Sequence, residues 1–170
     1  MYVYGLNQGL SILLNVVTTL GIGLLFGTVL QLVVFMVAYI PLRSYAGGYH
    51  ARTPVRCYAV SVMMLIMVSI FTKYIAITNW CCWILIIMSM VLIIFLSPIA
   101  DKNKPLDEIE VKVYKKRAIL IALTEVVLSA LFMLLHLQRL LIVMSWEFII
   151  MSSMLVIGCV KNKLETKNNK

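Results

Sequence analysis

The stretch YAVSVMMLIMVSIFTKYIAI occupies residues 58–77 of this chain, and WCCWILIIMSMVLIIFL follows at residues 80–96. Each run is close to the roughly 20 apolar residues that an α-helix needs to cross the hydrocarbon core of a bilayer. Neither run alternates between apolar and polar residues, so the pattern predicts helices rather than the strands of a membrane barrel. The short break Thr78-Asn79 between the two runs predicts a helical hairpin.

Further apolar runs lie on both sides of this hairpin. Residues 118–135 and 140–160 predict a second hairpin. Residues 6–42 are too long for one crossing and marginal for two, which leaves a tight hairpin or one span plus a re-entrant helix. Two helical segments are favoured because this stretch contains three glycines that can break a helix, namely Gly21, Gly23 and Gly27. The expected fold class is all-α, a polytopic integral membrane protein with about six helical membrane segments.

The composition excludes a water-soluble domain. Of the 170 residues, 62% are hydrophobic and 13% are charged, whereas soluble domains are about 45–50% apolar and about 25% charged. The net charge of +8 could indicate a nucleic-acid partner. However, the basic residues lie in short segments between apolar runs and are not interleaved with aromatic residues that could stack on bases. We therefore expect a lipid bilayer around the chain and no nucleic acid bound to it.

The basic residues predict the orientation of the chain. They are concentrated in residues 42–57, 98–117 and 161–170, and segments rich in Lys and Arg remain on the cytoplasmic side of a membrane. Both loops and the C-terminus are therefore expected in the cytoplasm. We expect one membrane domain over residues 1–170, divided into an N-terminal helical pair (6–42), a catalytic cytoplasmic loop (43–57), a hairpin (58–97), a basic cytoplasmic loop (98–117), a second hairpin (118–160) and a disordered cytoplasmic tail (161–170).

The segment RSYAGGYHARTPVRC at residues 43–57 carries the candidate chemistry. Thr53 is a good N-cap and Pro54 a good first helical residue, so a helix is expected to begin there. Cys57 would then lie in the first turn, where the helix macrodipole favours the thiolate form. The cationic neighbours Arg52 and Arg56 act in the same direction. The thiolate is the form of cysteine that acts as a nucleophile, so this position makes Cys57 a candidate nucleophile.

The same segment offers a base and an oxyanion site. His50 can reach Cys57 only if the chain folds back between them, and Pro54 disfavours helix at the residue before it. Gly47 and Gly48 can adopt positive φ and bring backbone N–H groups close to a substrate carbonyl. In the alternative interpretation, His50 is a polar residue at the membrane boundary and Cys57 is a small core residue.

Polar residues in the second half of the chain allow two interpretations each. Glu125 lies inside an apolar run and is a candidate acid that orients His50; the alternative is a buried structural pair with Arg117 or Arg43. Glu147 is interpreted as structural, and nearer the outer side of the membrane. The acids of residues 98–117 have no paired histidines, so neither a metal site nor a cofactor is expected.

The string Arg43-x-x-Ala46-Gly47-Gly48-Tyr49-His50-Ala51-x-Thr53-x(3)-Cys57 resembles the signature of the accessory gene regulator B (AgrB) family. Residues 98–110, with Asn103-Lys104-Pro105-Leu106, are similar to that family's second cytoplasmic loop, and Tyr4-Gly5-Leu6 is similar to the element before its first apolar run. Family members usually carry a further stretch before this last element. The resemblance implies a multi-pass protein of the bacterial cell membrane that processes a quorum-sensing peptide precursor.

The resemblance also implies roles for individual residues. Cys57 corresponds to the family's nucleophile, His50 to its general base, and Arg43 and Gly48 to motif positions for positioning and backbone approach. Cleavage would leave an acyl-enzyme thioester on Cys57, from which a substrate Cys or Ser could close a thiolactone or lactone. The expected partner is a small amphipathic precursor (AgrD-like) with an acidic tail, for which the candidate binding residues are Lys112, Lys115 and Lys116.

Three alternatives remain open at this level. The same lysines could serve only as topology signals. The chain could be a small peptide transporter or exporter, although it lacks the internal repeat typical of transporters. It could also be a non-catalytic membrane partner protein. The oligomeric state, the precursor and its cut site are not encoded in a recognisable pattern, and a homodimer is one option.

Overall fold

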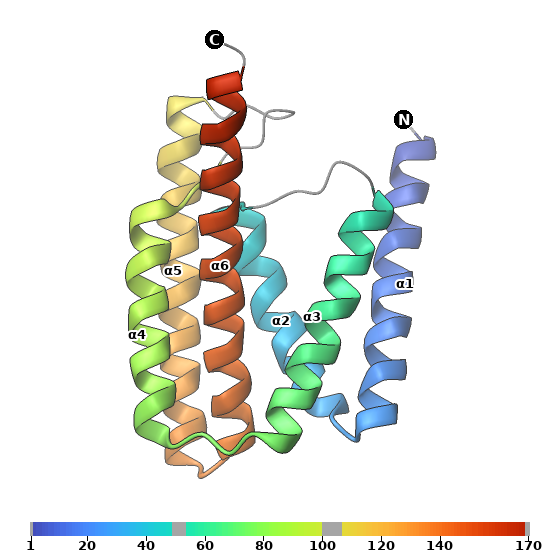
Figure 1. The fold of residues 1–170 in the computed structure, drawn as a ribbon, viewed down its shortest axis with the longest axis vertical. Helices are drawn as coiled ribbons and strands as arrows, with labels where there is room; N and C mark the ends of the chain where they lie inside the picture. The colour runs from blue at the N-terminus through green and yellow to red at the C-terminus, as the bar shows by residue number, and fades with distance from the viewer. Residues whose placement is uncertain (1, 49–53, 100–106, 169–170) are drawn as a thin grey trace. The chain divides into compact units, whose positions relative to one another are not determined.

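A computed structural model describes residues 2–48, 54–99 and 107–168, with side chains for residues 14–48, 55–99 and 107–164 (Figure 1). In these residues the chain forms six helices: α1 (Tyr2–Phe26), α2 (Val29–Ala46), α3 (Pro54–Tyr74), α4 (Asn79–Leu96), α5 (Glu108–Leu134) and α6 (Gln138–Asn168). Helices α2 to α6 are long and apolar enough to cross a membrane, and α1 contributes the shorter apolar stretch Leu14–Phe26. The predicted all-α, multi-pass fold is confirmed.

The helices form two compact units. The first contains all of α1, all of α3 and only the beginning of α2, over residues 1–34 and 51–76. The second contains the rest of α2 with α4, α5 and α6, over residues 35–50 and 77–170. Each unit is described separately below.

A glycine turn divides the N-terminal apolar stretch into two helices, as predicted. Gly27 follows the last residue of α1 with φ +68°. The N–H of Gly27 donates to the carbonyl of Leu24 at 3.3 Å, and the N–H of Thr28 donates to that of Gly23 at 2.8 Å. This pair of bonds is the Schellman motif, which satisfies carbonyl groups at a helix end. A side chain at Gly23 would collide with Val29, because its Cβ would lie 2.8 Å from the Cα of Val29.

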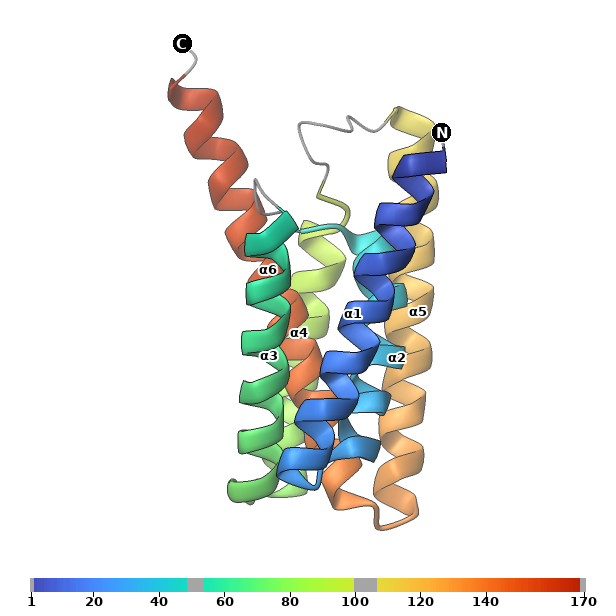
Figure 2. The same cartoon turned by 90° about the vertical axis from the view of Figure 1, so that its right-hand side faces the viewer.

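Hydroxyl groups link α3 to α1 and to the turn before α2 within the first unit. Figure 2 shows α1 and α3 side by side. The hydroxyl of Thr28 donates to that of Ser69 at 3.1 Å in a buried position, and the hydroxyls of Thr18 and Tyr58 form a hydrogen bond. Helices in lipid associate through close packing and hydrogen bonds of this kind, because no hydrophobic driving force acts between them.

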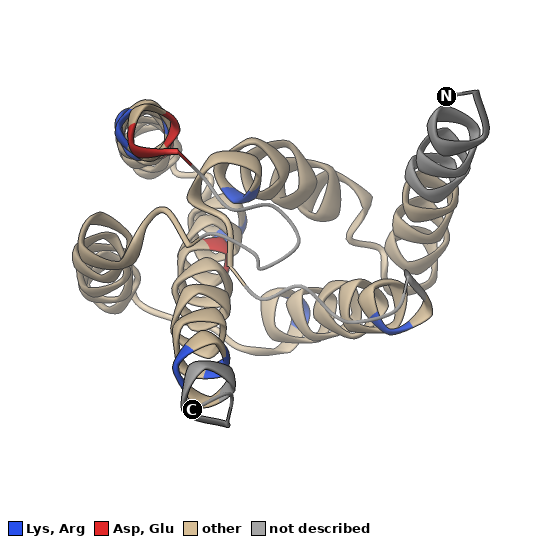
Figure 3. Ribbon diagram, turned by 90° about the horizontal axis from the view of Figure 1, so that it is seen from above, with Lys and Arg blue, Asp and Glu red and all other residues tan. Residues whose placement is uncertain are grey.

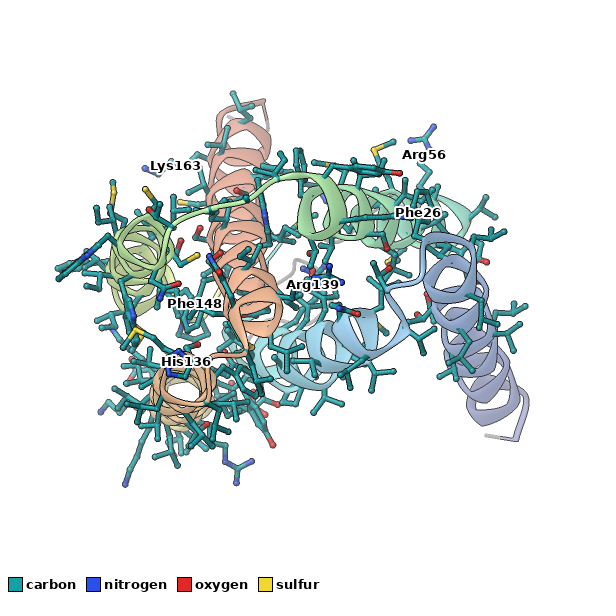
Figure 4. All side chains as sticks on the ribbon, turned by 90° about the horizontal axis from the view of Figure 1, so that it is seen from below. Phe26, Arg56, His136, Arg139, Phe148 and Lys163 are labelled. Atoms are coloured by element: carbon teal, nitrogen blue, oxygen red, sulfur yellow. The ribbon has the colours of Figure 1, made fainter. Side chains whose placement is uncertain are left out.

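Helix α6 is the most buried element of the second unit and packs mainly against α4. The buried face of α4 repeats at helical spacing through Cys82, Ile86, Ser89 and Ile93. The hydroxyl of Ser152 on α6 donates to that of Ser89 at 3.4 Å. Phe148 is fully buried and lies between α4, α5 and α6 (Figure 4). Helix α5 has a face of small residues, with Ala118 and Ala122 buried, which allows α5 to approach its neighbouring helices closely.

Three helices extend beyond the predicted boundaries. Helix α2 continues through Pro41 to Ala46, and α6 continues to Asn168, so disorder from residue 161 is wrong as far as residue 168. Helix α5 begins at Glu108, ten residues before the predicted start, because Asp107 and Glu110 form a capping box. The backbone N–H of Asp107 donates to the Glu110 carboxylate at 3.3 Å. The predictions ended each helix where its apolar run ended, whereas these helices continue past the hydrocarbon core.

The turn between α5 and α6 is a second Schellman motif, in which His136 takes the place that Gly27 has in the first. His136 has φ 56°, and bonds run from its N–H to Met133 at 3.1 Å and from Leu137 to Phe132 at 2.9 Å. His136 is therefore a turn residue.

The substitution Gly27→Ala should destabilise the protein by about 1–2 kcal/mol, because a β-carbon is disfavoured at positive φ. Gly21→Ala is the matched control, since a β-carbon there would meet no atom within 4 Å and alanine is the better helix former. Thermal unfolding in lipid nanodiscs measures both variants. Equal melting temperatures for the two variants would contradict the assigned turn.

Candidate catalytic site

Cys57 is an exposed free thiol in the first turn of α3. The helix begins at Pro54, as the sequence predicted. Arg56 is also exposed, and its side chain projects outward from α3 (Figure 4). Among the other cysteines, Cys82 is buried and Cys159 is half-buried. Cys81 is also exposed and lies in the first turn of α4, but no basic residue adjoins it in the sequence. Among the described cysteines, Cys57 is thus the exposed thiol that has both a helix start and an adjacent basic side chain.

Contacts around Cys57 hold the first turns of α3 in place. The hydroxyl of Ser61 donates to the carbonyl of Cys57 at 3.2 Å. The neighbouring residue Tyr58 bonds through its hydroxyl to Thr18 on α1. No pattern in the sequence reveals this hydrogen bond, because the two hydroxyls are 40 residues apart in the chain.

Several predicted residues lie outside the described part of the chain. His50, Arg52 and Thr53 are among them. So are residues 103–106, which are similar to the family's second cytoplasmic loop. The pairing of His50 with Cys57 therefore remains a prediction.

Gly47 occupies a position that only glycine fits. Its φ is +74°, and a β-carbon there would collide with the carbonyl oxygen of Ile99. The N–H of Ile99 donates to the carbonyl of Ala46 at 3.0 Å, which joins the end of α2 to the segment after α4. The N–H of Gly47 donates to the carbonyl of Arg43, also at 3.0 Å. Since this N–H is already engaged, Gly47 supports the turn rather than offering an oxyanion donor in this conformation.

Gly48 lies between α6 and Arg43. Its φ is +123°, and a β-carbon would lie 3.3 Å from the carbonyl oxygen of Met154 and 3.5 Å from Nη1 of Arg43. The guanidinium carbon of Arg43 lies 5.7 Å from the centroid of the Tyr39 ring, a distance at which a cation is attracted to the ring. Arg43 thus packs between Tyr39 and Gly48, and its predicted positioning role stays a prediction.

The three candidate tail-binding lysines lie on a helix rather than in a loop. Helix α5 has 27 residues, or about 40 Å, whereas the hydrocarbon core is about 30 Å thick. Its first turns therefore extend beyond the core. Figure 3 shows basic and acidic residues together at this end of α5. The spacing of three and four residues places the lysines on one face, and all are exposed: Lys112, Lys115 and Lys116.

A different face of the first turns of α5 packs against α2. The guanidinium of Arg117 lies 5.3 Å from the centroid of the Tyr45 ring and donates to the Tyr45 hydroxyl at 3.3 Å. Tyr114 meets Tyr45 edge to face, with centroids 5.7 Å apart. This contact engages Arg117 and leaves the lysine face open. No pattern in the sequence reveals the contact between Tyr45 and Arg117, since these residues are 72 positions apart.

Glu125 does not face solvent or a described basic side chain. It is 5% exposed and interacts electrostatically with Glu147, which is fully buried on α6. The sequence analysis placed Glu147 apart from Glu125, but the antiparallel α5–α6 hairpin brings them to the same depth. The orienting role of Glu125 toward His50 remains a prediction, because His50 is outside the described residues.

Comparison with known proteins identifies the family of the chain. The family model described as Accessory gene regulator B matches residues 1–158. The chain belongs to this family. Accessory gene regulator protein B of Staphylococcus haemolyticus (strain JCSC1435) is 28% identical over 129 residues, which cover 76% of the chain and 68% of that protein.

Two further AgrB relatives are similar over shorter parts of their length. The putative AgrB-like protein of Clostridium perfringens (strain SM101 / Type A) is 26% identical over 128 residues, covering 71% of the chain and 60% of that protein. Accessory gene regulator protein B of Staphylococcus intermedius is 26% identical over 105 residues, covering 62% of the chain and 56% of that protein. No solved structure matches the chain. The chain is therefore a multi-pass AgrB-family protein of a quorum-sensing system.

A water-soluble maleimide should modify Cys57 about tenfold or more faster than Cys82, because exposure controls thiol reactivity alongside ionisation. Two variants that each retain one of these cysteines, embedded in lipid, allow the comparison by mass spectrometry. Equal rates would contradict the placement of Cys57 at the exposed start of α3.

Proposed function

We propose that this AgrB-family chain is a cysteine endopeptidase that cuts a small peptide precursor at the cytoplasmic face of the membrane. The observation that carries the proposal is the exposed thiol of Cys57 in the first turn of α3, next to the exposed Arg56. A cationic helix start favours a thiolate, which is the nucleophilic form of cysteine. The motif that the chain shares with the family adds His50 as the base.

In the proposed mechanism, His50 takes the proton from Sγ of Cys57, and the thiolate attacks a peptide carbonyl of the precursor. The N–H of Gly48 is the proposed donor to the tetrahedral oxyanion. The C–N bond then breaks, His50 returns the proton to the leaving amine, and the acyl group remains on Cys57 as a thioester. A thiol or hydroxyl within the acyl group can displace Cys57 and close a ring, while hydrolysis would yield a linear acid.

Orientation in the membrane follows from the charged ends of α5 and α6. Basic residues lie at these helix ends, outside the uninterrupted apolar runs 118–135 and 140–160, including Lys115 on α5 and Lys163 on α6. Segments with such residues stay in the cytoplasm. We therefore propose that the C-terminus lies on the cytoplasmic side of the bacterial cell membrane. By the same rule we propose that side for the start of α3, which carries Arg56, and for the glycine turn, which follows Arg43.

Cys57→Ser and His50→Ala should each lower precursor cleavage by on the order of 10³-fold, because members of a catalytic unit depend on one another. Cleavage is measured by mass spectrometry with the full chain in lipid vesicles and a precursor peptide. Matched controls are Cys81→Ser, which alters another exposed thiol, and His136→Ala, which alters the described turn histidine.

The controls should retain cleavage and all four variants should remain in the membrane. Cleavage that persists in Cys57→Ala would overturn the proposal. A peptide that crosses the vesicle membrane uncut, with no requirement for Cys57, would instead support a transporter, and binding without cleavage would support a non-catalytic partner.

We also propose that Lys112, Lys115 and Lys116 bind the acidic tail of the precursor. Their exposure on a single face of α5 supports this role. Changing all three to Gln should raise KM by roughly tenfold with little change in kcat, since exposed ion pairs contribute about 0.2–1 kcal/mol each. The salt dependence of KM should also flatten, because the Debye length falls from about 10 Å at 0.1 M to about 3 Å at 1 M.

The paired change of Lys161 and Lys163 to Gln serves as the control, because it removes basic charge from α6 on the same side. KM should stay unchanged in that variant. An unaltered KM in the α5 variant, with its orientation preserved, would leave these lysines as topology signals only.

A further inference from the structure

Two carboxyl side chains are buried at the same depth of the α5–α6 hairpin. Glu125 is 5% exposed and Glu147 is 0% exposed. Glu125 precedes the end of α5 at Leu134 by the same number of residues as Glu147 follows the start of α6 at Gln138. Each lies about 14 Å from that end of its helix, at 1.5 Å per residue. Since the hydrocarbon core is about 30 Å thick, both carboxyl groups lie close to the centre of the membrane.

Neither carboxyl group has a hydrogen-bond partner among the residues that the structure describes. Both oxygen atoms of each group are buried and accept no hydrogen bond there. The hydroxyl of Ser129, one turn from Glu125, donates instead to the backbone carbonyl of Glu125 at 2.8 Å. Glu125 acts electrostatically on Glu147, so the two carboxyl groups are close enough for the charge of one to affect the other.

Basic side chains on the surrounding helices are remote from the pair. On α5 the nearest in sequence is Arg117, and on α6 it is Arg139, each about 12 Å along its helix from the carboxylate-bearing residue. Helix α4 contributes only the thiols of Cys81 and Cys82 as titratable groups.

The part of α2 in this unit contributes Tyr39, Arg43 and Tyr45 as titratable groups. Arg43 lies beside Gly48, which adjoins Met154 of α6. That level is about 10 Å further along α6 than Glu147. Tyr45 is engaged by Arg117. On the helices that pack around the carboxyl pair, therefore, no basic residue among those described lies at the level of Glu125 and Glu147.

Two buried carboxylates at the same depth would repel each other and lack solvation, which makes their joint ionisation costly. A bound proton removes one of the two charges and with it the repulsion, and the protonated group gains a donor that the other carboxylate can accept. A Ca²⁺ ion would need six to eight oxygen ligands, and no group of three or more metal-binding side chains occurs among the described residues. We propose that Glu125 and Glu147 form a proton-binding carboxyl pair at the centre of the membrane.

This site is separate from the proposed peptidase chemistry, since it requires neither Cys57 nor a precursor. Loss of the bound proton would place two like charges between α5 and α6, so the packing of these two helices depends on its presence. The pair can also accept a second proton, which leaves both groups neutral.

Carbodiimide labelling and infrared spectroscopy of the full chain in lipid vesicles at neutral pH test the proposal. Dicyclohexylcarbodiimide partitions into lipid and reacts with protonated carboxyl groups, so the adduct should map by mass spectrometry to Glu125 or Glu147. The exposed Glu108, at the start of the same helix, should remain unmodified. The infrared spectrum should contain a carboxylic acid C=O band that shifts in D₂O.

The band and the adduct should be lost in the double variant Glu125→Gln and Glu147→Gln, and both should persist in the control Glu108→Gln. Gln keeps the shape of a protonated Glu, so the double variant should still insert and fold. A wild-type protein with neither the adduct nor the band would overturn the proposal without reference to any variant. So would a band that persists in the folded double variant. Neither result bears on cleavage, which the Cys57 variants test independently.

Discussion

The interior of a bilayer contains no water that could bond to a peptide group, and this constraint governs every part of the protein. All backbone N–H and C=O groups at that depth must be satisfied within helices, so the chain can depart from helix only near the membrane surfaces. The Schellman turns at Gly27 and His136 show how it does so, because each satisfies the last carbonyls of a helix through two backbone bonds. Irregular backbone, exposed thiol and basic side chains are therefore concentrated at helix ends.

The same constraint explains where chemistry can occur. A nucleophile requires an accessible side chain, and an oxyanion site requires backbone N–H groups that no helix has used. Both occur only at helix ends. Cys57 lies at the start of α3, while Gly48 follows the end of α2 beyond the engaged N–H of Gly47.

The carboxyl pair of Glu125 and Glu147 is the exception to this arrangement. Several hydroxyls elsewhere in the spans bond within their helix or to a neighbour, such as Ser152 with Ser89. A carboxylate cannot be satisfied in this way, because it only accepts hydrogen bonds and carries a charge. Its retention inside a bundle needs a ligand that removes the charge, and intramembrane acids are commonly functional for that reason.

The sequence by itself determined the helical class, the hairpins and the helix start at Pro54, because hydropathy and capping are local properties of the chain. It also carried the motif from Arg43 to Cys57 that is typical of the family. It did not reveal that α5 starts at Glu108, since its capping box lies outside the apolar run. Only the tertiary structure decided why Gly47 must be glycine, which follows from the carbonyl of Ile99. The contacts of Thr18 with Tyr58, of Tyr45 with Arg117 and of Glu125 with Glu147 likewise join different helices. Such contacts depend on how one helix is rotated and shifted against another, and lipid-facing and core-facing residues are equally apolar here, so no sequence period records that rotation.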